Sequence, residues 1–159
     1  MKRVFLSFHY ANDNWRVQQI KNMGRIEGQA ILSSNEWEQV QRQGDVTIKR
    51  WINAQMNGRS CVVVLIGSGT ANRKWINYEI AHAWESGKYI IGLRIHKLKN
   101  LAGFSAPAGD NPFAYIKLNN GKTLADYVSC INPPGTSSTE AYAWIKDNIE
   151  AVVDKAVKK

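Results

Sequence analysis

The residue best suited to chemistry in this sequence is a glutamate with aromatic neighbours. Glu79 comes shortly after Trp75 and Tyr78, in a segment that follows the small-residue turn Gly67–Thr70. A carboxylate in the second turn of a helix that follows a buried strand lies near the carboxyl end of that strand, where open α/β sheets bind ligands. Glu79 is therefore a candidate active-site residue.

The helical pattern alone leaves the environment of Glu79 open. At about 100° per residue, four apolar side chains of the segment form one core-facing stripe, and Glu79 falls about 80° from the centre of that stripe, on the flank that carries Trp75. The position fits a carboxylate at the rim of a ligand site, and it also fits a solvated glutamate, which the spacing by itself favours. The stripe consists of Ile76, Ile80, Ala83 and Trp84.

Other common kinds of catalytic site find no support in the sequence. The phosphate-binding patterns GxGxxG and GxxxxGK[ST] are absent, and so is the nucleophile pattern GxSxG. The histidines His9, His82 and His96 are spread over different segments without the spacing of a metal site. Cys61 and Cys130 are expected to be small core residues rather than a disulfide or metal ligands. We therefore expect no metal and no resident cofactor.

Composition is that of an ordinary globular protein. The chain has 159 residues, 44% hydrophobic and 21% charged, which predicts a single domain over residues 1–159 with a full hydrophobic core. Without an apolar run long enough for a membrane span or a signal peptide, the protein is expected to be cytoplasmic. The net charge of +8 favours anionic partners, but the basic residues are scattered along the sequence.

Apolar runs predict the strands of a mostly parallel sheet. Cys61–Ile66 is apolar throughout, as expected for a strand that is covered on both faces. The other predicted strands are Val4–Phe8 and Tyr89–Ile95, with weaker candidates at Ala30–Leu32, Phe113–Leu118 and Tyr127–Ile131.

Helical patterns alternate with these strands. Besides the segment that carries Glu79, we predict helices from about Trp15 to Met23, from Asp45 to about Asn57, and after the capping box formed by Ser137 and Glu140. The segments Ser33–Glu38 and Lys97–Pro112 are predicted loops. This alternation predicts a three-layer α/β fold of the flavodoxin-like type, with a central, mostly parallel sheet of about five strands.

Four segments of the sequence form a family pattern. The most specific is VVLIGSGTANRKWINYEI at Val63–Ile80, which reads as an apolar strand followed by GS-x-T-x4-W-x3-EI. The others are RVFLSFHY at Arg3–Tyr10, SNEWE at Ser34–Glu38 and NPFAYI at Asn111–Ile116. Together they resemble the TIR-like family typified by the TIR protein of Thoeris anti-phage systems.

This resemblance implies an enzyme that uses NAD as its substrate rather than as a cofactor. TIR domains have a flavodoxin-like fold, and many bacterial members cleave NAD with a glutamate on the helix after the third strand, which is Glu79 here. The resemblance also implies an NAD pocket, in which Arg16, His9 or Arg73 would meet the pyrophosphate. The implied pocket residues are Phe8, His9, Tyr10, Ser68, Trp37, Trp75 and Arg16.

The same resemblance implies partners. In Thoeris-type proteins the product is a cyclic ADP-ribose isomer, a second messenger that activates an effector protein, and the trigger involves a phage component. TIR domains also self-assemble, often completing an active site with a neighbouring subunit. Two alternatives remain open from the sequence: a non-catalytic TIR-like assembly module, and the weaker possibility of nucleic-acid binding through the basic charge.

Overall fold

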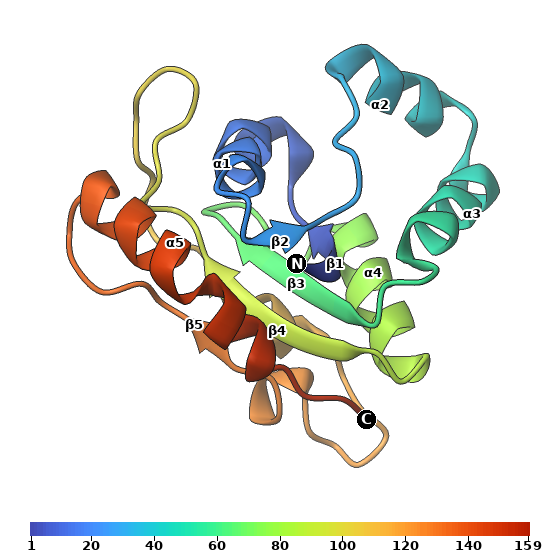
Figure 1. The fold of residues 1–159 in the computed structure, drawn as a ribbon. Coiled ribbons are helices and arrows are strands. Elements are labelled where there is room, and N and C mark those ends of the chain that lie inside the picture. The colour runs from blue at the N-terminus through green and yellow to red at the C-terminus, as the bar shows by residue number, and fades with distance from the viewer.

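A five-stranded parallel sheet forms the centre of the protein. The computed structural model describes residues 1–159, and its strands lie in the order β2-β1-β3-β4-β5 (Figure 1). All four neighbouring pairs are parallel. This is the flavodoxin-like strand order, so the predicted fold class is confirmed. The strands are β1 (Lys2–Ser7), β2 (Ile26–Glu27), β3 (Cys61–Ile66), β4 (Tyr89–Arg94) and β5 (Cys130–Ile131).

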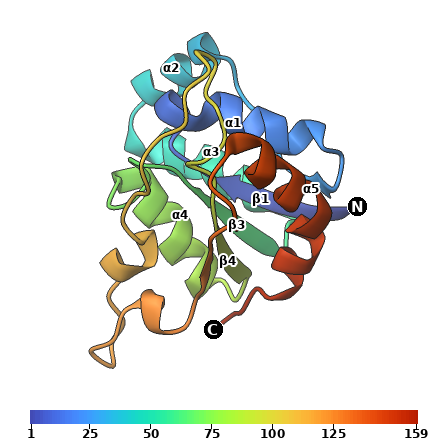
Figure 2. The ribbon, with the colours of Figure 1, turned by 90° about the vertical axis from the view of Figure 1, so that its left-hand side faces the viewer.

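Helices cover both faces of the sheet, as the views in Figures 1 and 2 show. One face packs against α1 and α5, and the other packs against α3, α4 and two short 3-10 helices, η1 and η2. The helix α2 adds no buried residue to either core cluster. The bounds are α1 (Tyr10–Asn22), α2 (Ser34–Arg42), α3 (Asp45–Met56), α4 (Lys74–Glu85), η1 (Pro112–Tyr115), η2 (Leu124–Asp126) and α5 (Ser138–Asp154).

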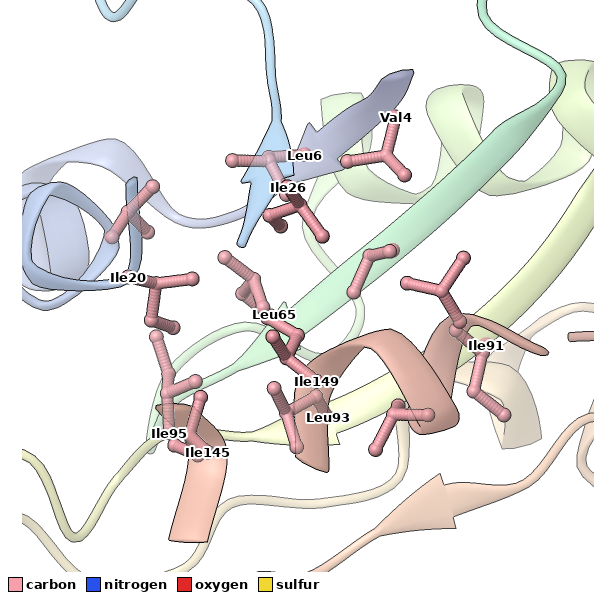
Figure 3. Close-up of a cluster of buried hydrophobic side chains, with 14 of the residues drawn as sticks. Val4, Leu6, Ile20, Ile26, Leu65, Ile91, Leu93, Ile95, Ile145 and Ile149 are labelled. Atoms are coloured by element: carbon pink, nitrogen blue, oxygen red, sulfur yellow. The ribbon is translucent and has the colours of Figure 1, made fainter. Parts of the chain in front are cut away.

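The alternation of side chains along β1 divides its residues between the two cores. Val4 and Leu6 point into the cluster beneath α1 and α5, where they lie with Ile20, Ile145 and Ile149 (Figure 3). Phe5 points to the opposite face and packs with residues of α3 and α4. Successive residues of a strand face opposite sides of the sheet, so Ser7 faces the same side as Phe5, towards α4.

Several of the weaker secondary-structure predictions are wrong. The second strand is Ile26–Glu27, and Ala30–Leu32 lies outside any strand. Phe113–Leu118 begins within η1, after the helix cap that Asn111 provides to the backbone N–H of Phe113. Of Tyr127–Ile131, only Cys130–Ile131 pairs with the sheet.

The predicted loop Ser33–Glu38 is in fact the start of α2. Its first turn is closed by a capping box: the Ser33 hydroxyl accepts from the backbone N–H of Glu36 at 3.2 Å, and the Glu36 carboxylate accepts from the N–H of Ser33 at 3.1 Å. The segment reads as a loop because most of its side chains are polar, yet the capping box satisfies backbone N–H groups at the start of the helix. By contrast, Lys97–Asn111 contains no helix or strand, as predicted. None of the helices is both long and apolar enough to span a bilayer.

Candidate active site

A cavity of about 660 Å³ opens at the carboxyl end of β1. Its walls come from the end of β1, the start of α1, the segment 29–32, and the helices α2, α3 and α4. The site is next to the point where the chain changes direction across the sheet, between β1 and β3, which is where flavodoxin-like folds bind ligands. Six of the eight predicted site residues line it: Phe8, His9, Tyr10, Trp37, Trp75 and Glu79.

Glu79 is buried, and only 8% of the residue is exposed. Its Oε1 accepts a hydrogen bond of 3.0 Å from the Ser7 hydroxyl, and Oε2 has no hydrogen-bond partner in the protein. Burial raises the pKa of Glu79 to about 8, against the opposing effect of the Ser7 hydrogen bond. The interpretation of Glu79 as a solvated helix residue is therefore wrong, because α4 lies with this side chain against β1 rather than towards water.

Aromatic side chains form a continuous wall of the cavity. Phe8, Tyr10, Trp37 and Trp51 follow one another with ring centroids 6.2, 6.1 and 6.0 Å apart. The Tyr10 hydroxyl donates to the carbonyl of Leu32 at 2.5 Å, which fixes the ring against the segment before α2. Spacings of this size suit tilted aromatic pairs, and the exposed faces can stack on a planar ligand.

The positive potential of the cavity comes from the starts of two helices, α1 and α4. His9 is the N-cap of α1 and Arg73 is the N-cap of α4, and neither side chain caps its own helix. Unsatisfied N–H groups at helix starts favour anions. Burial, and secondarily the positive charge of Arg73, lower the pKa of His9, so its ring is neutral at pH 7, and its buried Nδ1 has no partner. Lys74 adds a further charge to this end of the cavity.

Arg16 and Ser68 lie outside the cavity, in contrast to the prediction. Arg16 is buried: it pairs with Asp13 at 2.8 Å, and it donates to the carbonyls of Leu98 at 2.7 Å and Phe104 at 2.9 Å. Its role is to anchor the loop Lys97–Asn111 to α1. Ser68 is exposed at the surface of the turn after β3. The sequence placed both residues in segments that follow strands, but it did not show the direction of their side chains.

Two residues that sequence reasoning missed help to build the site. Trp51, on α3, is half-buried and ends the aromatic wall. Gln29 uses its amide to accept from the N–H of Leu6 and donate to its carbonyl, both at 2.8 Å. The side chain thus replaces the strand partner that β1 lacks beyond the short β2. Nothing in the sequence marks Gln29 for this role.

The side chains at the site do not suggest metal chemistry. No group of three or more histidine, cysteine, aspartate or glutamate side chains is placed to hold a metal ion. Both cysteines are free, and burial raises the pKa of Cys61 to about 11, so its thiol is not a nucleophile at neutral pH. Glu79 remains the carboxylate whose environment is most strongly perturbed, a common property of catalytic groups.

Comparison with known proteins identifies the relatives of this chain. The family described as "Thoeris protein ThsB, TIR-like domain" matches residues 5–100, which include the end of β1, the aromatic wall and α4. A protein of Bacillus cereus (strain MSX-D12), named "Putative cyclic ADP-D-ribose synthase ThsB1", is 38% identical over 134 residues, which cover 79% of this chain and 70% of that protein. The family match covers more than half of the chain, and the chain belongs to the TIR-like domain family of the Thoeris protein ThsB.

Proposed function

We propose that this protein cleaves NAD between nicotinamide and ribose and closes the remaining ADP-ribose into a cyclic isomer. The observation that carries the proposal is Glu79, a buried carboxylate with one free oxygen in an aromatic cavity. The cavity volume of about 660 Å³ is in the range of small-molecule sites. The Bacillus cereus relative is named "Putative cyclic ADP-D-ribose synthase ThsB1", and this name supports the same reaction.

One carboxylate is enough for the bond-breaking step. The bond between the ribose C1 and the nicotinamide nitrogen breaks with both electrons going to nitrogen, so nicotinamide leaves neutral and needs no acid. The positive charge moves to the ribose, which becomes oxocarbenium-like. The ionised Glu79 carboxylate accepts hydrogen bonds from the ribose hydroxyls and stabilises this charge.

The aromatic wall supplies what ring closure requires. A nitrogen or hydroxyl of the same molecule attacks the ribose C1 and releases one proton, in competition with water. A dinucleotide whose adenine stacks on the wall formed by Phe8, Tyr10, Trp37 and Trp51 is held in a folded shape, and apolar rings keep water out. His9, Arg73 and Lys74 are the groups that we assign to the pyrophosphate.

Membership of the Thoeris family supports a role in anti-phage defence. The cyclic product would be a second messenger for a partner effector protein, and turnover would respond to a trigger of phage origin. NAD is the substrate in this proposal, and no other cofactor takes part. A neighbouring copy of the chain can complete the site by covering the cavity mouth.

The direct test is the identity of the product. Purified protein is incubated with NAD, alone and in lysate from phage-infected cells. The nucleotides are then separated, and their masses are determined by mass spectrometry. We expect nicotinamide together with a product that has the mass of ADP-ribose less one water. Linear ADP-ribose would correct the proposal to simple hydrolysis. No turnover in either condition would favour the non-catalytic assembly module instead.

Cleavage should become faster as the pH rises towards about 8. The pKa of Glu79 is raised to about 8, so the carboxyl is largely protonated at pH 6 and has no charge to offer the ribose. We expect kcat/KM to rise about tenfold per pH unit below pH 7 and to level above pH 8. Bound NAD carries a positive charge on its nicotinamide, which favours the ionised carboxylate. The plot of kcat against pH should therefore level off at a lower pH than the plot of kcat/KM. A rate of cleavage that is flat from pH 5.5 to 9 would contradict this role.

Removing the positive charge of Arg73 should weaken NAD binding without slowing the chemistry. In Arg73→Gln we expect KM to rise about fivefold at low salt, a modest effect because the side chain is exposed. The value of kcat should stay near that of the unmodified protein. Arg42→Gln is the matched control, since Arg42 is an exposed arginine on α2 outside the cavity. Equal changes of KM in both variants would assign the effect to overall charge.

A further inference from the structure

The hydroxyl that contacts Glu79 belongs to a buried serine at the end of β1. Ser7 is the last residue of this strand and is completely buried. Its Oγ donates to Oε1 of Glu79 at 3.0 Å, across 72 positions of the sequence. A buried hydroxyl is seldom left without a partner, and here its side-chain partner is the carboxylate. This contact links β1 directly to the candidate catalytic residue.

The strand end that carries Ser7 is held on both sides. On one side Ser7 pairs in register with Val64 of β3. On the other side, where β2 has already ended, Gln29 binds both the N–H and the carbonyl of Leu6. The residue before Ser7 therefore has a partner on both edges, as a residue in the middle of a sheet has, so the backbone that carries the hydroxyl has a defined position. A hydrogen bond from such a donor orients a carboxylate.

We propose that Ser7 is a positioning residue for Glu79: its hydroxyl holds Oε1 against β1, which leaves Oε2 facing the cavity and keeps the carboxylate available as an anion. The assignment rests on the proposed function for its consequence in catalysis, but the contact itself does not depend on the substrate. A hydroxyl that donates to a carboxylate stabilises the charged form, which opposes the effect of burial.

Other charged groups near Glu79 do not take over this role. None of them makes a hydrogen bond or an ion pair with its carboxylate. On α3, Asp45 pairs with Lys74 and Lys49 lies over the ring of Tyr78, so the contacts of both side chains are with residues of α4 other than Glu79. The titratable side chains that share the cavity are His9 and Tyr10 of the β1–α1 turn, Glu38 of α2, and Arg73 and Lys74 at the start of α4.

Titration of Glu79 by carbon NMR tests the proposal without any turnover. In protein with labelled glutamate side chains, the Glu79 signal is assigned by its loss in Glu79→Gln. We expect Ser7→Ala to raise the pKa of Glu79 by about one unit, and Ser7→Thr, which keeps the hydroxyl, to restore most of the original value. Thr70→Val is the matched control, because Thr70 is a completely buried residue whose hydroxyl accepts a hydrogen bond from the N–H of Gly67 instead.

The kinetic consequence is a displaced pH profile. In Ser7→Ala we expect NAD cleavage at pH 7 to fall about tenfold, to recover above pH 9, and to keep its KM. If Ser7→Ala does not fold, Ser7→Cys keeps the volume with a much weaker donor and should show the same shift. An unchanged Glu79 titration in the folded variants, or an equal shift in Thr70→Val, overturns the proposal. If no variant cleaves NAD while the titration shifts, the proposed function fails and the role of Ser7 stands.

Discussion

Glu79→Gln is expected to lower the rate of NAD cleavage by about 10²- to 10³-fold. Glutamine has the shape of glutamate and can still accept the hydrogen bond from Ser7, which the carboxylate accepts at 3.0 Å. It lacks the negative charge that stabilises an oxocarbenium-like ribose. The loss should therefore fall on kcat, with a smaller change in KM. Nicotinamide release, followed under the condition in which the unmodified protein is most active, measures both values.

Glu38→Gln is the control that shows whether the position of the lost negative charge in the cavity matters. Glu38 lines the same cavity from α2, but its side chain is exposed and lies 3.8 Å from Arg42. Removal of this charge should change kcat less than about threefold, because an exposed carboxylate is screened by water. If Glu79→Gln and Glu38→Gln reduce kcat equally, the effect comes from the total negative charge of the cavity rather than from Glu79 itself. If neither does, Glu79 is not the catalytic residue.

The central part of the fold could be predicted because its residues leave little choice. Cys61–Ile66 is buried on both faces, and α4 carries a clear apolar stripe, so pattern and structure agree there. Patterns fail where structure depends on polar contacts or on very few residues. The helix α2 has no buried residue, and its start is set by the capping pair Ser33 and Glu36. The strand β2 is too short for any alternation to show.

The sequence predicted which residues come together at the cavity better than it predicted their geometry. The resemblance pointed to Glu79, and the aromatic residues Phe8, Tyr10 and Trp37 do line the same cavity. The burial of Glu79 could not be predicted, because it depends on the distance between α4 and a strand whose sequence lies far away. Arg16 was predicted to line the cavity, but it lies outside it. Its partner Asp13 is close in the sequence, whereas Leu98, whose carbonyl accepts another of its hydrogen bonds, is far away in the loop after β4.

Glu79→Gln is also expected to make the protein more stable, by about 3 kcal/mol at pH 7. In the folded protein the pKa of Glu79 is raised from 4.5 to about 8, so the native state binds the proton more tightly than the unfolded chain does. The unmodified protein has this advantage in full below pH 4.5 and loses it as the pH rises towards 8. Glutamine is never ionised, so the variant avoids the loss. Denaturant unfolding from pH 4.5 to 8.5 measures the difference.

The dependence on pH is what ties this gain to the function. The two proteins should be equally stable near pH 4.5 and should differ most above pH 8, whereas better packing would give the same difference at every pH. Glu85→Gln is the control, because Glu85 is an exposed glutamate on the same helix and pairs only with Lys159 at the surface. A gain in Glu79→Gln that is independent of pH would mean that burial does not disfavour the charge. The site would then lack the destabilised anion on which oxocarbenium stabilisation depends, since a well-solvated carboxylate has little to gain from a cationic ribose.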